Sequence, residues 1–194
     1  MKKLMTAAIA GIVLGVATLS APAQAATYKV DPAHAFAVFK VSHFGWSNNW
    51  GRFNDVSGSV DFDKSDVTKS KVSITIKTAS VDTNHKKRDA HLRSPDFFNA
   101  KEFPEMKFVS TKIMKTGDKT ANVTGNLTLL GVTKPVTLSV TWNREGPHFR
   151  NKDKTHTGFS ATGTIKRSDF GMKKFVPAIG DNITIFLDVE AIKQ

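Results

Sequence analysis

The chain has 194 residues and a mass of 21.2 kDa, with 40% hydrophobic and 23% charged residues, a composition typical of one globular domain and unlike a disordered or fibrous chain. The 28 Lys and Arg residues outnumber the 17 Asp and Glu residues, giving a formal net charge of +11, so a partner attracted by charge is anionic. Cysteine is absent, which excludes disulfides, zinc-thiolate sites, thiol nucleophiles, covalent haem attachment and a lipidated cysteine.

The first 25 residues have the pattern of a bacterial secretory signal peptide. A basic start at 1–3 precedes an uncharged apolar run at 4–19 and the small-residue stretch 21–25. The run is shorter than the roughly 20 apolar residues of a membrane-spanning helix, so we predict cleavage after Ala25 and export to the periplasm. The folded domain is predicted at 26–194, and export argues against nucleic acid as a partner.

The rest of the chain alternates apolar and polar residues with a period of two, the pattern of half-buried strands. The clearest runs are 71–77, 122–129, 136–143 and 183–189, weaker runs are 35–43, 56–62, 106–113 and 157–166, and a short edge piece lies at 27–30. Helical periodicity is nearly missing, and every proline after the leader falls between these runs. We therefore predict about eight antiparallel strands in one all-β domain.

Three predicted strands carry a glycine on their apolar face: Gly58, Gly125 and Gly163. Glycine at such a position either lets a coiled strand bend or leaves open space beside it. Three together favour a closed barrel over a sandwich. An eight-stranded barrel is just wide enough to be filled by its own side chains or to hold one slender ligand.

The segment 80–98 combines basic, histidine and aromatic residues. Thr83 or Asn84 is expected to cap a short helix that must stop before Pro95, because a residue preceding proline avoids helical geometry. In one interpretation the helix is a lid over one end of the barrel, closed by Leu92, Phe97, Phe98 and Phe103, with Arg88, His91 and Arg93 facing an anionic head group. In the other it is a structural cap, in which Arg88 and Arg93 pair with Asp82, Asp89 or Asp96.

A second basic cluster, Lys166, Arg167, Lys173 and Lys174, lies between two predicted strands. The simplest interpretation is a solvated loop. If these residues ring the mouth of the barrel, they concentrate acidic lipid head groups there, an effect that added salt weakens.

The histidines do not have the spacing of a metal site, and no metal is predicted. His34 and His43 are separated by an odd number of residues on extended chain, and His85 and His91 do not share a helical face. No residue is predicted to be catalytic, since neither Gly-x-Ser-x-Gly nor Ser-x-x-Lys occurs.

Four segments resemble the YceI family of exported polyisoprenoid-binding proteins. They are Ser-Val-Asp-Thr at 80–83, Arg-Asp-x-His-Leu-Arg-Ser-x-Asp-Phe at 88–97, Gly-Asn-Leu-Thr-Leu-x-Gly-Val-Thr-Lys-Pro-Val at 125–136 and Arg-Ser-Asp-Phe-Gly at 167–171. The resemblance covers essentially all of 26–194. It implies an antiparallel eight-stranded lipocalin-like barrel with a short helix-bearing loop, and an isoprenoid or similar long-chain lipid bound in its lumen in the periplasm. It implies no covalent cofactor and no catalytic set.

On this basis we predict two groups of binding residues. The lumen group comprises Phe39, Val41, His43, Val60, Phe62, Val72, Ile74, Leu127, Leu129, Leu138, Val140, Phe159, Ile165, Ile185 and Leu187. The mouth or head-group set comprises Arg88, His91, Leu92, Arg93, Phe97 and Phe98.

The leading hypothesis is non-catalytic binding or carriage of a quinone or polyprenyl phosphate. One alternative is an enzyme that acts on lipid with His43 or His91 as acid or base. Another is a structural or stress-related interaction protein whose barrel is filled by its own side chains. A transient contact with a membrane surface and a homodimer through an exposed strand edge also stay open.

Overall fold

The computed structural model describes residues 25–194. Residues 1–24 of the predicted signal peptide lie outside the described part of the chain, so its cleavage stays a prediction. Among residues 25–194, no helix combines the length and the hydropathy that crossing a membrane requires.

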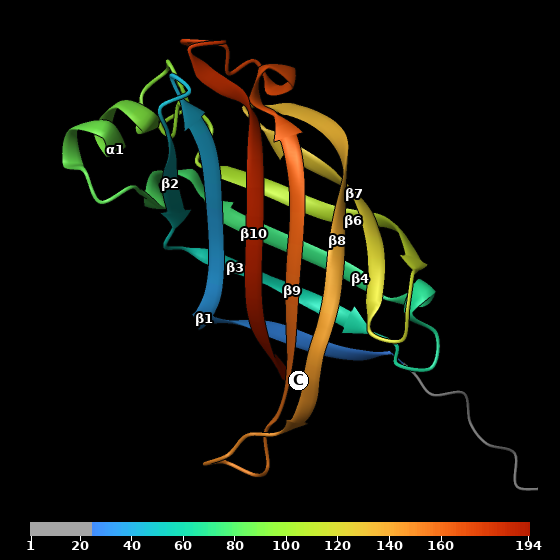
Figure 1. Ribbon diagram of the computed structural model, residues 1–194. Helices are drawn as coiled ribbons and strands as arrows, with labels where there is room; N and C mark the ends of the chain where they lie inside the picture. The colour runs from blue at the N-terminus through green and yellow to red at the C-terminus, as the bar shows by residue number, and fades with distance from the viewer. Residues whose placement is uncertain (1–24) are drawn as a thin grey trace, which may run out of the picture.

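Strands make up most of the domain (Figure 1). They are β1 (Ala26–His43), β2 (Ser47–Phe53), β3 (Val56–Phe62), β4 (Lys71–Lys77), β5 (Val81–Asp82), β6 (Glu105–Lys115), β7 (Thr120–Leu129), β8 (Val132–Pro147), β9 (Thr155–Lys166) and β10 (Ile179–Lys193). The helical elements are α1 (Lys86–Arg93) and the 3-10 turns η1 (Val67–Lys69), η2 (Thr78–Ser80) and η3 (Arg167–Phe170).

Eight of the strands close into an antiparallel barrel, which confirms the predicted fold. The order runs from β10 through β9, β8, β7, β6, β4 and β3 to β1, and β1 pairs again with β10. Tyr28 lies opposite Val60 of β3 and Lys193 of β10, so the two ends of the chain complete the ring. Closure removes the exposed edges of an open sheet from these eight strands.

Strand β1 is one long element where the sequence predicted two pieces. Its register against β10 jumps between Val30 and Ala35, so residues 31–34 form a bulge opposite Glu190. A bulge bends a strand, and here it marks the point where β1 changes its second partner from β3 to β2 (Figure 1). Strands β2 and β5 were not predicted, because residues 47–53 are largely polar and β5 has two residues.

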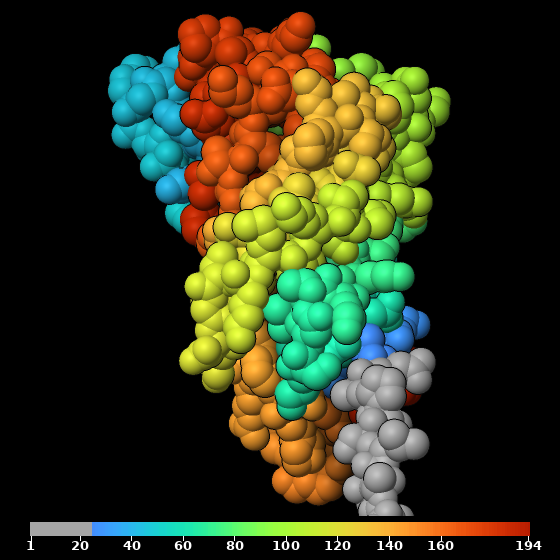
Figure 2. Space-filling view, turned by 90° about the vertical axis from the view of Figure 1, so that its right-hand side faces the viewer, coloured from blue at the N-terminus to red at the C-terminus, as the bar shows by residue number. Residues whose placement is uncertain are grey.

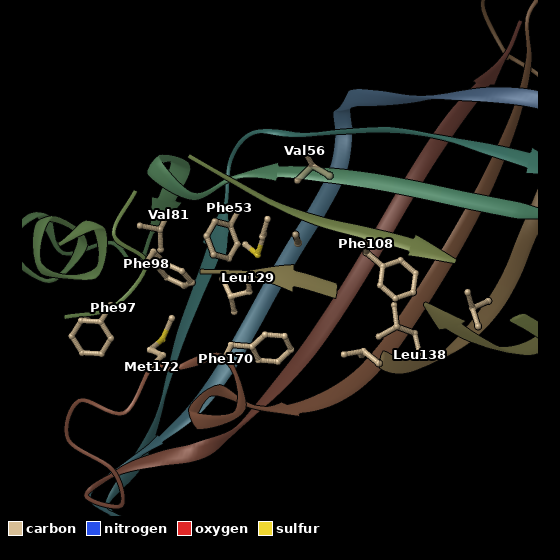
Figure 3. Close-up of a cluster of buried hydrophobic side chains, with 14 of the residues drawn as sticks. Phe53, Val56, Val81, Phe97, Phe98, Phe108, Leu129, Leu138, Phe170 and Met172 are labelled. Atoms are coloured by element: carbon tan, nitrogen blue, oxygen red, sulfur yellow. The ribbon is translucent and has the colours of Figure 1, made fainter. Parts of the chain in front are cut away.

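The alternation of the sequence sorts side chains between the inside and the outside of the barrel. Val123 and Leu129 of β7 are 5% and 3% exposed, whereas Asn126 between them is exposed. Phe97, Phe98 and Met172 gather under the α1 end, and Phe108 lies further along the barrel (Figure 3). A second cluster around Tyr28, Val60, Phe62 and Ala191 packs with Trp142 and Phe159.

Helix α1 ends before Pro95 as predicted, but its cap differs. His85 is the N-cap residue, and its Nδ1 accepts the backbone N–H of Arg88 at 3.2 Å. The Thr83 hydroxyl is not free to cap the helix because it donates to the buried Asp89 carboxylate. The expected cap at Thr83 or Asn84 was therefore wrong.

The strand glycines do not leave open space. A methyl group on Gly125 would meet the ring of Phe108 and would lie 2.6 Å from the carbonyl oxygen of Val109. A methyl group on Gly163 would lie 2.6 Å from Cδ2 of Leu138. These two glycines thus make room for neighbouring side chains, while Gly58, with φ of +150°, has a backbone conformation that favours glycine.

Candidate functional site

An apolar cavity of about 370 Å³ occupies the barrel lumen. All eight ring strands contribute to its wall, since their inward side chains alternate with outward ones. This volume falls within the roughly 300–1,000 Å³ of small-molecule sites. The barrel is therefore not filled by its own side chains.

The cavity is lined by almost the whole predicted lumen group. The residues in its wall are Phe39, Val41, Val60, Phe62, Val72, Ile74, Leu127, Leu129, Leu138, Val140, Phe159, Ile165, Ile185 and Leu187. Of the predicted mouth residues, Arg88, His91, Leu92, Phe97 and Phe98 line it. Their contribution to binding remains a prediction.

His43 and Arg93 do not line the cavity. His43 is the last residue of β1 and lies beyond Val41, the last residue of this strand that lines the cavity. The His43 ring instead stands edge-on to Phe44, with centroids 4.7 Å apart. Arg93 turns away from the lumen and donates to the backbone carbonyls of Ala79 and Val81 at 3.1 and 3.0 Å.

Several lining residues were missed from the sequence. Met106 and Phe108 stand on the apolar face of a predicted strand, so the alternation alone contained the signal for them. Ile113 is out of phase with these two residues and reaches the wall only because the register of β6 against β7 shifts between Ser110 and Lys112. Phe53 lies on the unpredicted β2, and only the pairing of that strand with β1 brings it to the wall. Trp50 of the same strand borders the cavity, but its side chain is 52% exposed and stacks on Phe186.

Arg88, the arginine of α1 that lines the cavity, donates hydrogen bonds to the loop before its own helix. Arg88 donates from Nε to the Thr83 hydroxyl and from a terminal nitrogen to the Thr83 carbonyl, both at 2.7 Å. Neither Arg88 nor Arg93 forms the carboxylate pair that the structural-cap interpretation expected, because both donate to loop oxygens. Asp89 is buried and accepts the Thr83 backbone N–H at 2.8 Å.

His91 of α1 contacts a carboxylate of the following loop. Its Nε2 lies 2.9 Å from Oδ2 of Asp96, and Nζ of Lys174 lies 3.3 Å from the same oxygen. The hydrogen bond from His91, followed by the nearby Lys174, lowers the pKa of Asp96. The imidazole of His91 lines the cavity at the α1 end and is 44% exposed.

Arg167 contradicts the expectation of a solvated loop. It is 3% exposed, and its guanidinium donates to the carbonyls of Gly180, Met172 and Ile179, each at 2.9 Å. Burial lowers the pKa of this guanidinium, while the neighbouring Asp181 opposes that shift. Arg167 ties η3 to the start of β10 and leaves the other three basic residues of the cluster exposed.

The cavity reaches the surface at two ends. At the α1 end its wall includes the half-exposed His91 and Phe175, and at the other it includes Lys115, Asp118 and Lys119 of the β6–β7 hairpin. This hairpin and the segment around η1 lie beside each other on the face shown in Figure 2. The lumen is thus a tunnel with an aromatic end and a charged end.

One group of side chains has the residue types of a metal site. Asp31, His34 and Glu190 bring ligand atoms within 4.8 Å of one another. Asp31 and His34 already contact each other at 2.7 Å, and this hydrogen bond lowers the pKa of Asp31 and raises that of His34. None of the three lines the cavity, so the group is a surface ion pair outside the candidate site. The histidine spacings missed it because Glu190 comes from the far end of the chain.

The fold and the cavity define a ligand-binding β-barrel with an apolar lumen. The chain belongs to the YceI family: the model of the YceI-like domain matches residues 28–191. A UPF0312 protein of Pseudomonas putida is 45% identical over 188 residues, covering 95% of this chain and 96% of that protein.

Two solved structures share the fold. The crystal structure of Burkholderia cenocepacia BcnA has a TM-score of 0.76 at 28% identity, covering 84% of this chain and 99% of that chain. A polyisoprenoid binding domain from Saccharophagus degradans, implicated in plant cell wall breakdown, has a TM-score of 0.66 at 14% identity, covering 88% and 100%.

Proposed function

We propose that this protein binds a long isoprenoid-type lipid without covalent attachment, and carries or buffers it in the periplasm. The observation that supports this most directly is the continuous apolar tunnel of about 370 Å³. The name of the Saccharophagus degradans domain, a polyisoprenoid binding domain of the same fold, agrees with this ligand class.

The energetics favour a long tail over a short one. Burying about ten methylene equivalents contributes roughly 8 kcal/mol, against an association cost of about 4 to 15 kcal/mol. A longer branched chain exceeds that cost, and its stiff units lose less conformational freedom on entering a narrow tunnel. The two-ended lumen lets a chain longer than the cavity extend out of it.

The polar groups at the α1 end support an uncharged head group, such as that of a quinone, over a phosphorylated one. Arg88 and Arg167 line the cavity, but both are engaged by loop oxygens of the protein. A phosphate beside His91 would also approach the Asp96 carboxylate. A quinone head group is uncharged, so it needs no free cation and brings no second negative charge beside Asp96.

The test is mass spectrometry of lipid extracted from protein purified from its natural host. We expect a long-chain isoprenoid in near-stoichiometric amount. Repeated preparations with an empty lumen would contradict carriage.

No covalent step is part of the proposal. The enzymatic alternative named His43 or His91 as acid or base, and of these two residues His91, whose ring contacts Asp96, lines the cavity. Turnover of a labelled lipid that is lost in His91→Ala, with the barrel intact, would replace carriage by catalysis.

A further inference from the structure

Three exposed aromatic side chains gather at the α1 end of the barrel. Phe44 and Trp46 lie in the turn between β1 and β2, and Phe175 lies in the loop between η3 and β10; they are 51%, 86% and 48% exposed. The rings of Phe44 and Trp46 have centroids 5.8 Å apart. The backbone N–H of Phe44 donates to the carbonyl of Ala178 at 2.8 Å, which joins the turn to the loop. We call Phe44, Trp46 and Phe175 the aromatic rim.

The aromatic rim adjoins the tunnel. Phe175 lines the cavity, and its ring lies 6.2 Å from that of His91 and 6.4 Å from that of Phe97. The β1–β2 turn and the loop before β10 stand together at the top of the barrel (Figure 1). Large aromatic groups exposed together beside a ligand tunnel mark a contact surface, since an isolated soluble domain gains nothing from hydrating them.

Positive charge surrounds the aromatic rim. Helix α1 begins with the exposed Lys86 and Lys87, and its single carboxylate, Asp89, is buried. The loop 171–178 carries Lys173 and Lys174, both exposed, and no carboxylate. The nearby Asp96 is contacted by Lys174 and His91. The surface around the rim therefore attracts anions.

At other places in the described part of the barrel, exposed aromatic side chains, lysines and the cavity wall do not occur together. The other end of the tunnel is lined by Lys115, Asp118 and Lys119 of the β6–β7 hairpin. Phe149 is 71% exposed in the β8–β9 loop, at the end of the barrel opposite the rim, but it does not line the cavity. Among residues 25–194, aromatic exposure, lysines and tunnel wall meet at the α1 end.

We propose that the aromatic rim docks on an anionic bilayer surface, so that lipid passes between membrane and tunnel without crossing water. Aromatic side chains favour the headgroup region of a bilayer, and lysines are attracted to anionic lipid. Each lysine near such a surface strengthens binding about fivefold. This inference rests on the proposed lipid binding and adds to it the route of transfer.

The experiment is co-sedimentation of the mature protein with phosphatidylglycerol-containing vesicles and, separately, with pure phosphatidylcholine vesicles. Trp46→Ser removes the most exposed rim residue, which does not line the cavity. Phe149→Ser is the control, since it removes another strongly exposed aromatic side chain, 71% against 86% for Trp46, at the opposite end. We expect Trp46→Ser to weaken binding to anionic vesicles by about tenfold, Phe149→Ser to leave it unchanged, and salt to weaken wild-type binding.

Loading with a long-chain quinone in detergent separates this inference from the proposed function. Trp46→Ser should take up the quinone as the wild type does. If neither protein takes up quinone, lipid binding is rejected. If both take it up but the wild type does not bind vesicles, only the docking surface is rejected. Equal losses in Trp46→Ser and Phe149→Ser, or equal binding to both vesicle types, would overturn the docking surface. A dimer that Trp46→Ser abolishes, without vesicle binding, would assign the rim to a second copy of the chain.

Discussion

Replacing Ala161 by phenylalanine should block the tunnel and weaken binding of a long-chain quinone. Ala161 lines the cavity from β9, between Val140 of β8 and Leu187 of β10, which also line it. Its small side chain leaves lumen space that a phenyl ring would occupy.

The size of the effect follows from the carbons displaced. A phenyl ring takes the place of about one five-carbon isoprene unit of the tail. At about 0.8 kcal/mol for each buried carbon, the loss is roughly 4 kcal/mol, or about a thousandfold in Kd. Folding should change far less, because the ring enters a cavity rather than a filled core.

Tryptophan fluorescence is the assay, because Trp142 lines the cavity and a quinone bound there quenches it. Thr164→Phe is the matched control, since Thr164 lies on the same strand but is exposed on the outside of the barrel. Equal quinone affinity in Ala161→Phe, Thr164→Phe and the wild type would refute the view that the tail lies in the lumen.

Three further predictions concern folding. Arg167→Met leaves three carbonyls, that of the buried Met172 among them, without their donor and should lower the free energy of unfolding by roughly 3–5 kcal/mol in guanidinium titrations, with partial recovery in Arg167→Lys. No loss would mean that these hydrogen bonds are not formed. Gly125→Ala should lower the free energy of unfolding by about 1–3 kcal/mol in thermal denaturation, and adding Phe108→Leu to the same chain should recover part of this loss. An unchanged stability of Gly125→Ala would show that the Phe108 ring moves freely. Two neighbouring lysines lower the pKa of Glu105 to about 2 from 4.5, so the stability it contributes is present above about pH 4.5 and is lost as the pH falls through 2. Glu105→Gln should flatten stability against pH in that window, and an unchanged profile would disprove the assignment.

The sequence by itself determined the eight strands of the ring and which of their faces points inward. The alternation at Val123 and Leu129, or at Ile183 and Ile185, is a local property that a strand keeps wherever it pairs. For that reason nearly all predicted lumen residues line the cavity. His43 is the exception: it is the last residue of β1, and its ring packs against Phe44 instead.

Only the tertiary structure decided how the barrel closes and how much space its side chains leave inside it. Pairing of Tyr28 with Lys193, and the proximity of Glu190 to His34, join residues from opposite ends of the chain, which no local pattern encodes. Two features depended on neighbours in space: the burial of Arg167 under the loop carbonyls and the filling of the space at Gly125 by Phe108. A period of two fixes the direction of a side chain, whereas the volume left inside a barrel depends on which side chains meet there from strands distant in sequence.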